Sequence, residues 1–111
     1  MKNLETKMRQ SGEELLDLLK ALAHPIRLKI IVDLINDEVD AERHCSSFGL
    51  TVTKATRSHH FKILKDSGLI AHVDRGNRSF ARLRRVELEA LYPGLLSLLK
   101  NNYQQCINLS S

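Results

Sequence analysis

The sequence has few aromatic residues, no long apolar run and only two cysteines. Aromatic residues make up 5% of the chain and apolar residues 42%, so we expect a core of leucine, isoleucine and valine. No apolar run is long enough to span a membrane, and residues 1–10 alternate charge with polarity where a signal peptide would be apolar. Without such a signal, Cys45 and Cys106 favour a reducing compartment over a disulfide framework. We therefore expect a cytoplasmic protein with no membrane partner.

Motifs that carry catalysis are also missing. The sequence contains no glycine-rich phosphate loop, no nucleophile elbow and no pair of carboxylates within an apolar run. A length of 111 residues allows one compact domain and leaves no room for a catalytic cleft between two domains. We therefore expect a single domain over residues 1–111, with no catalytic residues and no cofactor.

Positive charge is concentrated in one part of the chain. The whole chain has a net charge of +4, whereas residues 54–85 alone carry +7, from nine basic and two acidic residues. Such a basic block within a folded segment favours a surface that binds a polyanion, and nucleic acid is the commonest polyanion partner. A solubilising face would have the same composition, so the charge alone leaves both interpretations open.

Capping residues and apolar spacing predict two helices at the start of the chain. Ser11 and Glu14 fit a capping box, which places the start of the first helix near Gly12. Pro25 disfavours a helical residue before it and suits the first turn of a new helix, so the first helix should stop at His24. We expect helices over about residues 12–23 and from Pro25 onward.

Two further helices are expected before residue 68. Apolar residues spaced i, i+4, i+7 predict a short helix from Ala41 to Phe48, ended by Gly49, although its register is left open. Thr53 can cap the next helix, which we expect over residues 54–67. The two helices would be joined by a tight turn that contains glycine.

A hairpin and a last helix complete the predicted elements. Residues 70–74 and 79–84 have a strand-like period, and Gly76-Asn77 lies between them as a two-residue turn. Residues 86–91 predict one or two helical turns, and a last helix is expected over about residues 94–106.

The two terminal helices carry more apolar surface than one small domain can cover. We expect helices 12–23 and 94–106 to form a homodimer interface. Its predicted residues are Leu15, Leu19, Leu95, Leu99 and Tyr103.

This order of elements indicates a mainly α fold with a two-stranded β-hairpin wing, the winged helix-turn-helix. In this fold the second helix of the pair enters the major groove and presents its first residues to base edges, while the hairpin straddles neighbouring phosphates. Small polar and basic residues at the start of helix 54–67 suit the first role. Arg75 and Arg78 beside the hairpin turn suit the second, although edge-strand charges that block aggregation are an alternative.

Three segments in the order just described resemble the ArsR/SmtB family of bacterial repressors. They are ALAHPIRLKIIVDLI, TKATRSHHFKILKDSGLI and RGNRSFARLR, and the resemblance spans roughly Leu15 to Leu99. It implies a transcriptional repressor that binds an inverted-repeat operator in double-stranded DNA as a homodimer and is released by an inducer, often a metal ion. It also implies that Lys54, Ala55, Ser58 and His59 face the groove, with His60 and Lys62 near the backbone. The DNA-binding residues expected in full are Thr53, Lys54, Ala55, Thr56, Ser58, His59, His60 and Lys62 of the recognition helix, and Arg75, Asn77 and Arg78 of the wing.

The sequence departs from the family pattern at two places. Arg57 stands where family members usually have an apolar residue facing the core, so it must reach outward, contact phosphate or shift the helix. Residues 42–50 lack the usual apolar-rich first helix of the pair. For His59 and His60, a solvated helix surface is the simpler alternative to DNA contact.

No metal site is expected. His44 and Cys45 are adjacent and point in different directions on a helix, and residues 95–111 contain no histidine, aspartate or glutamate. Cys45 and Cys106 lie on apolar helix faces, where cysteine behaves as a small hydrophobe, although a thiol or metalloid switch between them stays open. His24 and His72 are expected to be structural. No motif in the sequence identifies the operator, the regulated genes or the inducer. The alternative function is a winged-helix module that binds a protein partner or RNA.

Overall fold

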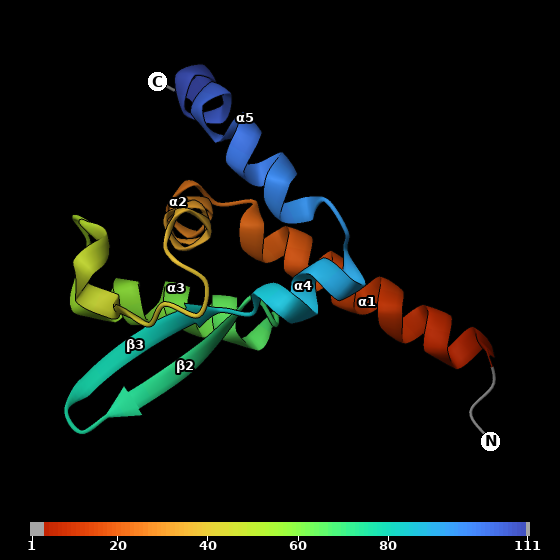
Figure 1. The fold of residues 1–111 in the computed structure, drawn as a ribbon, viewed down its shortest axis with the longest axis horizontal. Helices are drawn as coiled ribbons and strands as arrows, with labels where there is room; N and C mark the ends of the chain where they lie inside the picture. Colours follow the sequence, from red (N-terminus) through yellow and green to blue (C-terminus); the bar gives the residue numbers. More distant parts are fainter. Residues whose placement is uncertain (1–3, 111) are drawn as a thin grey trace.

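Helices form most of the structure, and a small antiparallel sheet projects from them (Figure 1). The computed structural model describes the backbone of residues 4–110 and the side chains of residue 12 and residues 14–104. The helices and strands are, in chain order, α1 (Leu4–Leu22), α2 (Pro25–Asn36), β1 (Arg43–His44), the 3-10 helix η1 (Cys45–Phe48), α3 (Lys54–Asp66), β2 (Ile70–Arg75), β3 (Arg78–Leu83), α4 (Arg85–Leu91) and α5 (Leu95–Ser110). The mainly α winged helix-turn-helix predicted from the sequence is confirmed.

The first helix is longer than predicted. α1 begins at Leu4, so Ser11 lies inside the helix and the predicted capping box near Gly12 is wrong. In the sequence, Leu4 and Met8 precede Leu15 at helical spacing, a pattern that is compatible with the earlier start of the helix. Because these apolar positions are widely spaced and separated by charged residues, the helical period is difficult to recognise in the sequence.

The break between α1 and α2 occurs where proline predicts it. α1 ends at Leu22, and Pro25 occupies the first turn of α2. His24 has extended backbone, and its Nδ1 accepts a hydrogen bond at 3.1 Å from the backbone N–H of Ile26. His24 is therefore the N-cap of α2, which is a structural role.

The segment before the recognition helix contains a strand that the sequence did not predict. Residues 43–44 form β1, which pairs antiparallel with β3, and only Cys45–Phe48 are helical, as a 3-10 turn. The α-helix expected from Ala41 to Phe48 is therefore wrong. The backbone of residues 43–44 pairs with β3, so it does not form helical hydrogen bonds. Gly49 ends the turn in the left-handed conformation, with φ +68°, as expected.

The sheet forms the wing. Its strand order is β1-β3-β2, and the β2–β3 register runs from Ile70 opposite Leu83 to Arg75 opposite Arg78. Gly76 takes the positive φ of +67° that the two-residue turn requires. The hairpin is therefore confirmed, with each strand one residue away from its predicted bounds at the turn.

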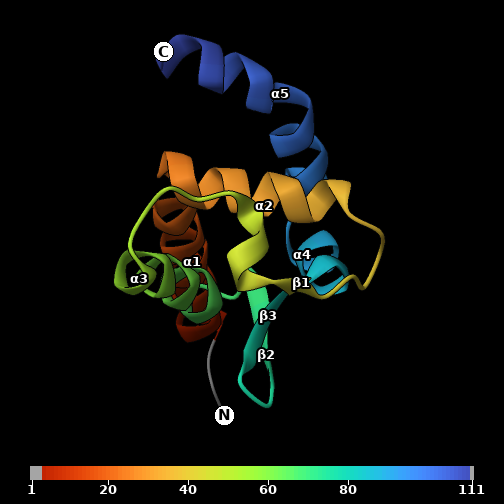
Figure 2. The ribbon, with the colours of Figure 1, turned by 90° about the vertical axis from the view of Figure 1, so that its left-hand side faces the viewer.

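The core lies between α1, α2, α3 and the inner face of the sheet (Figure 2). Aliphatic side chains fill most of it, and the rings of Phe48 and Phe61 lie 5.4 Å apart at its centre, joining η1 to α3. α5 packs across α2 and α4 through buried Leu96. Within residues 4–110, no helix is long and apolar enough to cross a membrane.

Candidate nucleic-acid interface

The recognition helix α3 has well-defined ends. Thr53 caps it, since the Thr53 Oγ1 accepts a hydrogen bond at 3.1 Å from the backbone N–H of Thr56. Phe61 and Leu64 are buried and hold the inner side of the helix against the core. Gly68, with φ +85°, follows the last turn. The helix therefore has the bounds expected from its cap and its glycine.

The outer side of α3 is polar and exposed. Lys62 of this surface forms an ion pair with Asp66 one turn later, at 2.7 Å. The other exposed side chains are small or carry hydrogen-bonding groups. The predicted DNA-binding residues that the structure places on this surface are Thr53, Lys54, Ala55, Thr56, Ser58, His59 and Lys62.

His60 is the exception among the predicted recognition residues. Only 5% of its surface is exposed, its ring centroid lies 4.6 Å from that of His24, and its Nδ1 lies 3.2 Å from the Arg27 guanidinium. Burial lowers the pKa of His60, and the neighbouring His24, Arg27 and His59 lower it further. The expected position of His60 near the DNA backbone is therefore corrected: it packs inside the protein, because the helical period turns it toward α2.

Arg27 connects three helices below this histidine. Its Nε donates to the carbonyl of Ala21 at 2.6 Å and its Nη2 donates to the carbonyl of Lys20 at 3.3 Å, both in the last turn of α1. A guanidinium suits the free carbonyls at a helix C-terminus. Burial and the charge of Arg27 also lower the pKa of His24. The cluster of His24, Arg27 and His60 thus fixes α3 against α1 and α2 through neutral imidazoles.

The wing presents Asn77 and Arg78 at an exposed tip, but Arg75 is engaged elsewhere. The Arg75 guanidinium donates to both carboxylate oxygens of Glu42, at 2.8–3.0 Å. Glu42 precedes β1 and lies far from Arg75 in the sequence, so no local pattern reveals the pair. The Glu42 carboxylate neutralises the positive charge of Arg75, which was expected from the sequence to contact phosphate.

The basic block of residues 54–85 divides into two groups. Four of its cations have partners within the chain: Lys62 pairs with Asp66, Arg75 with Glu42, Arg84 with the carbonyl of Gly68, and Arg85 with carbonyls at the end of α2. The other group makes no hydrogen bond or ion pair with any described residue. It consists of Lys54, Arg57, Lys65, Arg78 and Arg82.

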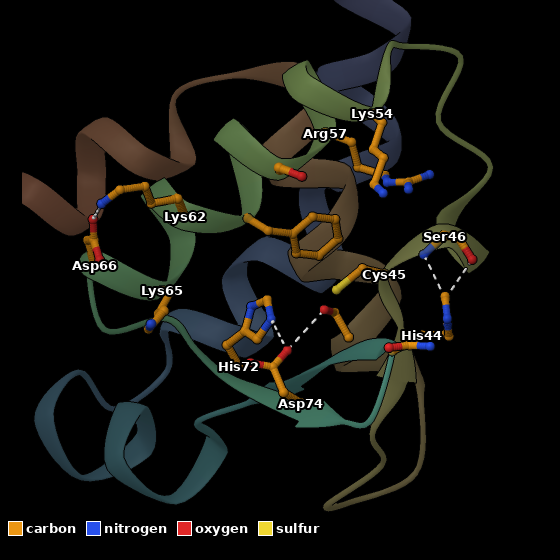
Figure 3. A pocket seen from close by; sticks show the side chains of 14 residues that line it. His44, Cys45, Ser46, Lys54, Arg57, Lys62, Lys65, Asp66, His72 and Asp74 are labelled. Atoms are coloured by element: carbon orange, nitrogen blue, oxygen red, sulfur yellow. Dashed lines mark hydrogen bonds and ion pairs between the residues drawn. The ribbon is translucent and has the colours of Figure 1, made fainter.

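A groove of about 480 Å³ separates α3 from the wing (Figure 3). Basic side chains of α3 line one wall, and polar side chains of η1, β2 and β3 line the other. Arg57, the departure from the family pattern, is half-buried and lines this groove, so it does not face the core. The sequence missed the groove because its walls come from three separate segments.

Cys45 forms part of the groove wall next to the core. It is 8% exposed, and burial raises its thiol pKa, an effect that Arg57 opposes and Asp74 reinforces. Such a thiol is mostly protonated near neutral pH and behaves as a small hydrophobe. The side chain of Cys106 lies outside the described residues. Among the described side chains, no three His, Cys, Asp or Glu residues come together as a metal site.

Comparison with known proteins identifies the class of regulator. No family model matches the chain. The chain is 32% identical over 95 residues to YceK of Bacillus subtilis strain 168, an uncharacterized HTH-type transcriptional regulator, and the match covers 83% of this chain and 93% of YceK. This chain belongs to the helix-turn-helix transcriptional regulators.

Solved structures place this regulator in the same fold. HlyU from Vibrio cholerae N16961 has a TM-score of 0.66 and 24% identity, covering 83% of this chain and 94% of HlyU. The homodimeric winged helix-turn-helix DNA-binding domain of Mb0332 from Mycobacterium bovis, a possible ArsR-family regulator, has a TM-score of 0.65 and 20% identity, covering 95% and 92%. The resemblance to the ArsR/SmtB family is confirmed at the level of the fold.

The predicted dimer residues of this regulator have two different environments. Leu15 and Leu19 of α1 are exposed, at 39% and 47%. Leu95 and Leu99 of α5 are partly buried against the chain's own core, and Tyr103 is partly buried near Asp33 of α2, whose charge adds to burial in raising the Tyr103 pKa. On the terminal helices, two further leucines are exposed that were not predicted as interface residues. They are Leu16, at 51%, and Leu98, at 59%.

Proposed function

We propose that this regulator is a repressor that binds an inverted-repeat operator in duplex DNA as a homodimer. The observation that carries the proposal is the outer surface of α3, where exposed polar side chains follow a capped helix N-terminus beside a protruding hairpin. An α-helix fits the major groove, and residues at its N-terminal end reach the base edges.

The side chains of α3 are chemically suited to base edges. Lys54 can donate to guanine, Ser58 and His59 can donate or accept, and Ala55 offers a methyl group for thymine. At the wing tip, Asn77 lines the end of the groove and Arg78 lies next to it, where the hairpin can meet a neighbouring phosphate.

The exposed leucines of α1 and α5 support a homodimer. Both helices pack on α2, and Figure 1 shows that α1 and α5 extend from it in directions away from the wing. Leu16, Leu19 and Leu98 would be covered by a second copy of the chain. A two-fold dimer presents two α3 helices, and these fit half-sites about one helical turn, roughly 34 Å, apart.

The proposal is tested by selecting binding sites from a random duplex library and measuring affinity for the selected DNA as a function of salt. We expect an inverted repeat, one dimer per site, and a strong decrease of affinity with salt. Placing the selected site over a promoter should reduce transcription in a purified system.

Three results would contradict the proposal. Selection that returns no common sequence would remove the specific operator. Binding to structured RNA with no binding to duplex DNA would favour the RNA-binding alternative. A monomer in sedimentation at micromolar concentration, with and without DNA, would remove the two-fold model.

A further inference from the structure

The groove between α3 and the wing has more positive charge than its own side chains compensate. Four cations line it, Lys54, Arg57, Lys62 and Lys65, together with the two carboxylates of Asp66 and Asp74. The formal charge of the lining is therefore +2, from four cations and two carboxylates. Like charges on one surface repel one another, and an anion bound between them would lower that repulsion.

Both carboxylates of the groove already have partners. Asp66 pairs with Lys62 at 2.7 Å, and this pair lowers the Asp66 pKa. The Asp74 Oδ1 lies 3.1 Å from His72 Nε2 and accepts a hydrogen bond from Ser79 at 3.0 Å. The remaining cations, Lys54, Arg57 and Lys65, have no acidic partner within the described part of the chain.

The three unpaired cations share one side of α3. Lys54, Arg57 and Lys65 recur at i, i+3 and i+11, which places them along the edge of the helix that faces the wing. Figure 3 shows the side chains of Lys54 and Arg57 next to each other, between α3 and the segment that carries Ser46. Arg57 is half-buried, so its position is set by the groove wall, whereas a fully solvated arginine would be free to move.

We propose that the groove between α3 and the wing is a phosphate site that holds one strand of the DNA backbone, with Arg57 as its main contact and Lys65 as a second cation farther along α3, while Lys54 keeps its role at the base edges. The planar guanidinium of arginine can donate two parallel hydrogen bonds to a phosphate. The inference rests on the proposed function and adds to it, because it moves the main phosphate contact from the wing residue Arg75 to the recognition helix.

The test replaces Arg57 with leucine, the type of side chain that family members usually have here, so the variant is expected to fold. On selected and on random duplex DNA, R57L should flatten the slope of log affinity against log salt by about 0.9 per subunit and weaken binding at least about fivefold at 0.15 M salt. Arg57→Lys keeps the charge, so its salt slope should stay close to that of the wild type. Lys100→Gln removes a charge from α5, away from the groove, and is the matched control.

The outcomes separate this proposal from the function on which it rests. Wild-type protein that binds no duplex DNA would contradict the proposed function. Wild-type binding with an unchanged salt slope in R57L would overturn the phosphate site alone. A second arm adds pyrophosphate at constant ionic strength: release of DNA at the same pyrophosphate concentration from the wild type and from R57L would place the competing anion elsewhere and would overturn the phosphate site.

Discussion

Two surfaces of this regulator differ in the residues they expose. The surface of α3 and the wing is basic and polar, whereas α1 and α5 expose leucines that no residue of the described chain covers. Charged and hydrogen-bonding groups suit a hydrated, charged partner such as DNA, and apolar side chains gain most from leaving water. The difference supports the proposal that the two surfaces serve different partners, and it predicts that each can be altered without the other.

α2 connects these two surfaces physically. α1 and α5 pack on one part of it, and its first turn contacts α3 through His24 and Arg27. The spacing of two α3 helices in a dimer therefore depends on α2, and a change at the apolar surface is expected to affect binding to an operator with two half-sites more than binding to random DNA.

The largest effect is expected at the apolar surface. Leu98→Glu should give monomers, because it buries an unpaired carboxylate in the dimer at a cost of about 3 kcal/mol or more, which weakens dimerisation by about a hundredfold or more. Sedimentation measures the dimer, and operator binding should decrease with it. Val86→Glu, at a 73% exposed position on α4, is the control and should leave the dimer intact.

Leu99→Glu is a useful contrast. Leu99 is partly buried against the core of its own chain, so this substitution should lower the free energy of unfolding as well as weaken the dimer. If Leu98→Glu stays dimeric while Val86→Glu does not, the exposed side of α5 is not the interface.

A smaller effect is expected within the basic surface, where base contacts and phosphate contacts should separate. Ser58→Ala or His59→Ala should cost about 1–3 kcal/mol on the selected operator and much less on random duplex, because each removes a group directed at base edges. Arg78→Ala should weaken both DNAs alike and flatten the salt slope by about 0.9 for each phosphate that the arginine neutralises. Fluorescence anisotropy on the two duplexes measures both quantities.

The opposite pattern would reverse the assignment of the two elements. If the α3 variants bind the operator like the wild type while Arg78→Ala loses sequence preference, the wing reads the bases and α3 does not.

The histidine cluster below α3 should make stability depend on pH. Burial, Arg27 and the facing imidazoles lower the pKa values of His24 and His60 in the folded state below the usual value near 6.5. As the pH falls, the unfolded chain therefore binds more protons than the folded chain does. The free energy of unfolding should be highest above about pH 6.5 and should decrease as the pH falls through the folded-state pKa values. Urea unfolding at a series of pH values measures this decrease.

A pair of matched variants identifies the source of the pH dependence. His60→Gln should make stability much less dependent on pH, whereas His59→Gln removes only the smallest influence on the His60 pKa and should keep most of the wild-type dependence. Equal pH dependence in both variants would show that the cluster of His24, Arg27 and His60 does not cause it.

Local chemistry made some of these features predictable and long-range contacts hid the others. Thr53, Pro25 and Gly76 act through their own backbone and neighbours, so the start of α3, the start of α2 and the hairpin turn could be predicted from single residues. The pairing of β1 with β3 and the burial of His60 depend on segments far apart in the chain, and no periodicity encodes them.

The same distinction applies to the candidate site. Exposed residues of α3 follow from the helical period, which places Ser58 and His59 outward. The groove could not be predicted, because Arg57 looks like a core position in the sequence and only the fold shows the wing opposite it. The compensation of Arg75 by Glu42 is likewise a tertiary contact.

The smallest effect is expected from the pair of Glu42 and Arg75 on the wing. Glu42→Gln removes a negative charge beside the basic surface and frees the Arg75 guanidinium, so affinity for random duplex should rise about threefold and the salt slope should steepen by up to about 0.9 per subunit. Exposed ion pairs contribute only about 0.2–1 kcal/mol, so the free energy of unfolding should change little. Arg75→Ala, which removes a charge already compensated, should weaken DNA binding less than Arg78→Ala does. If Glu42→Gln lowers affinity for random DNA, the ion pair holds the wing in its binding position, and its role is to orient the hairpin rather than to limit the charge that DNA meets.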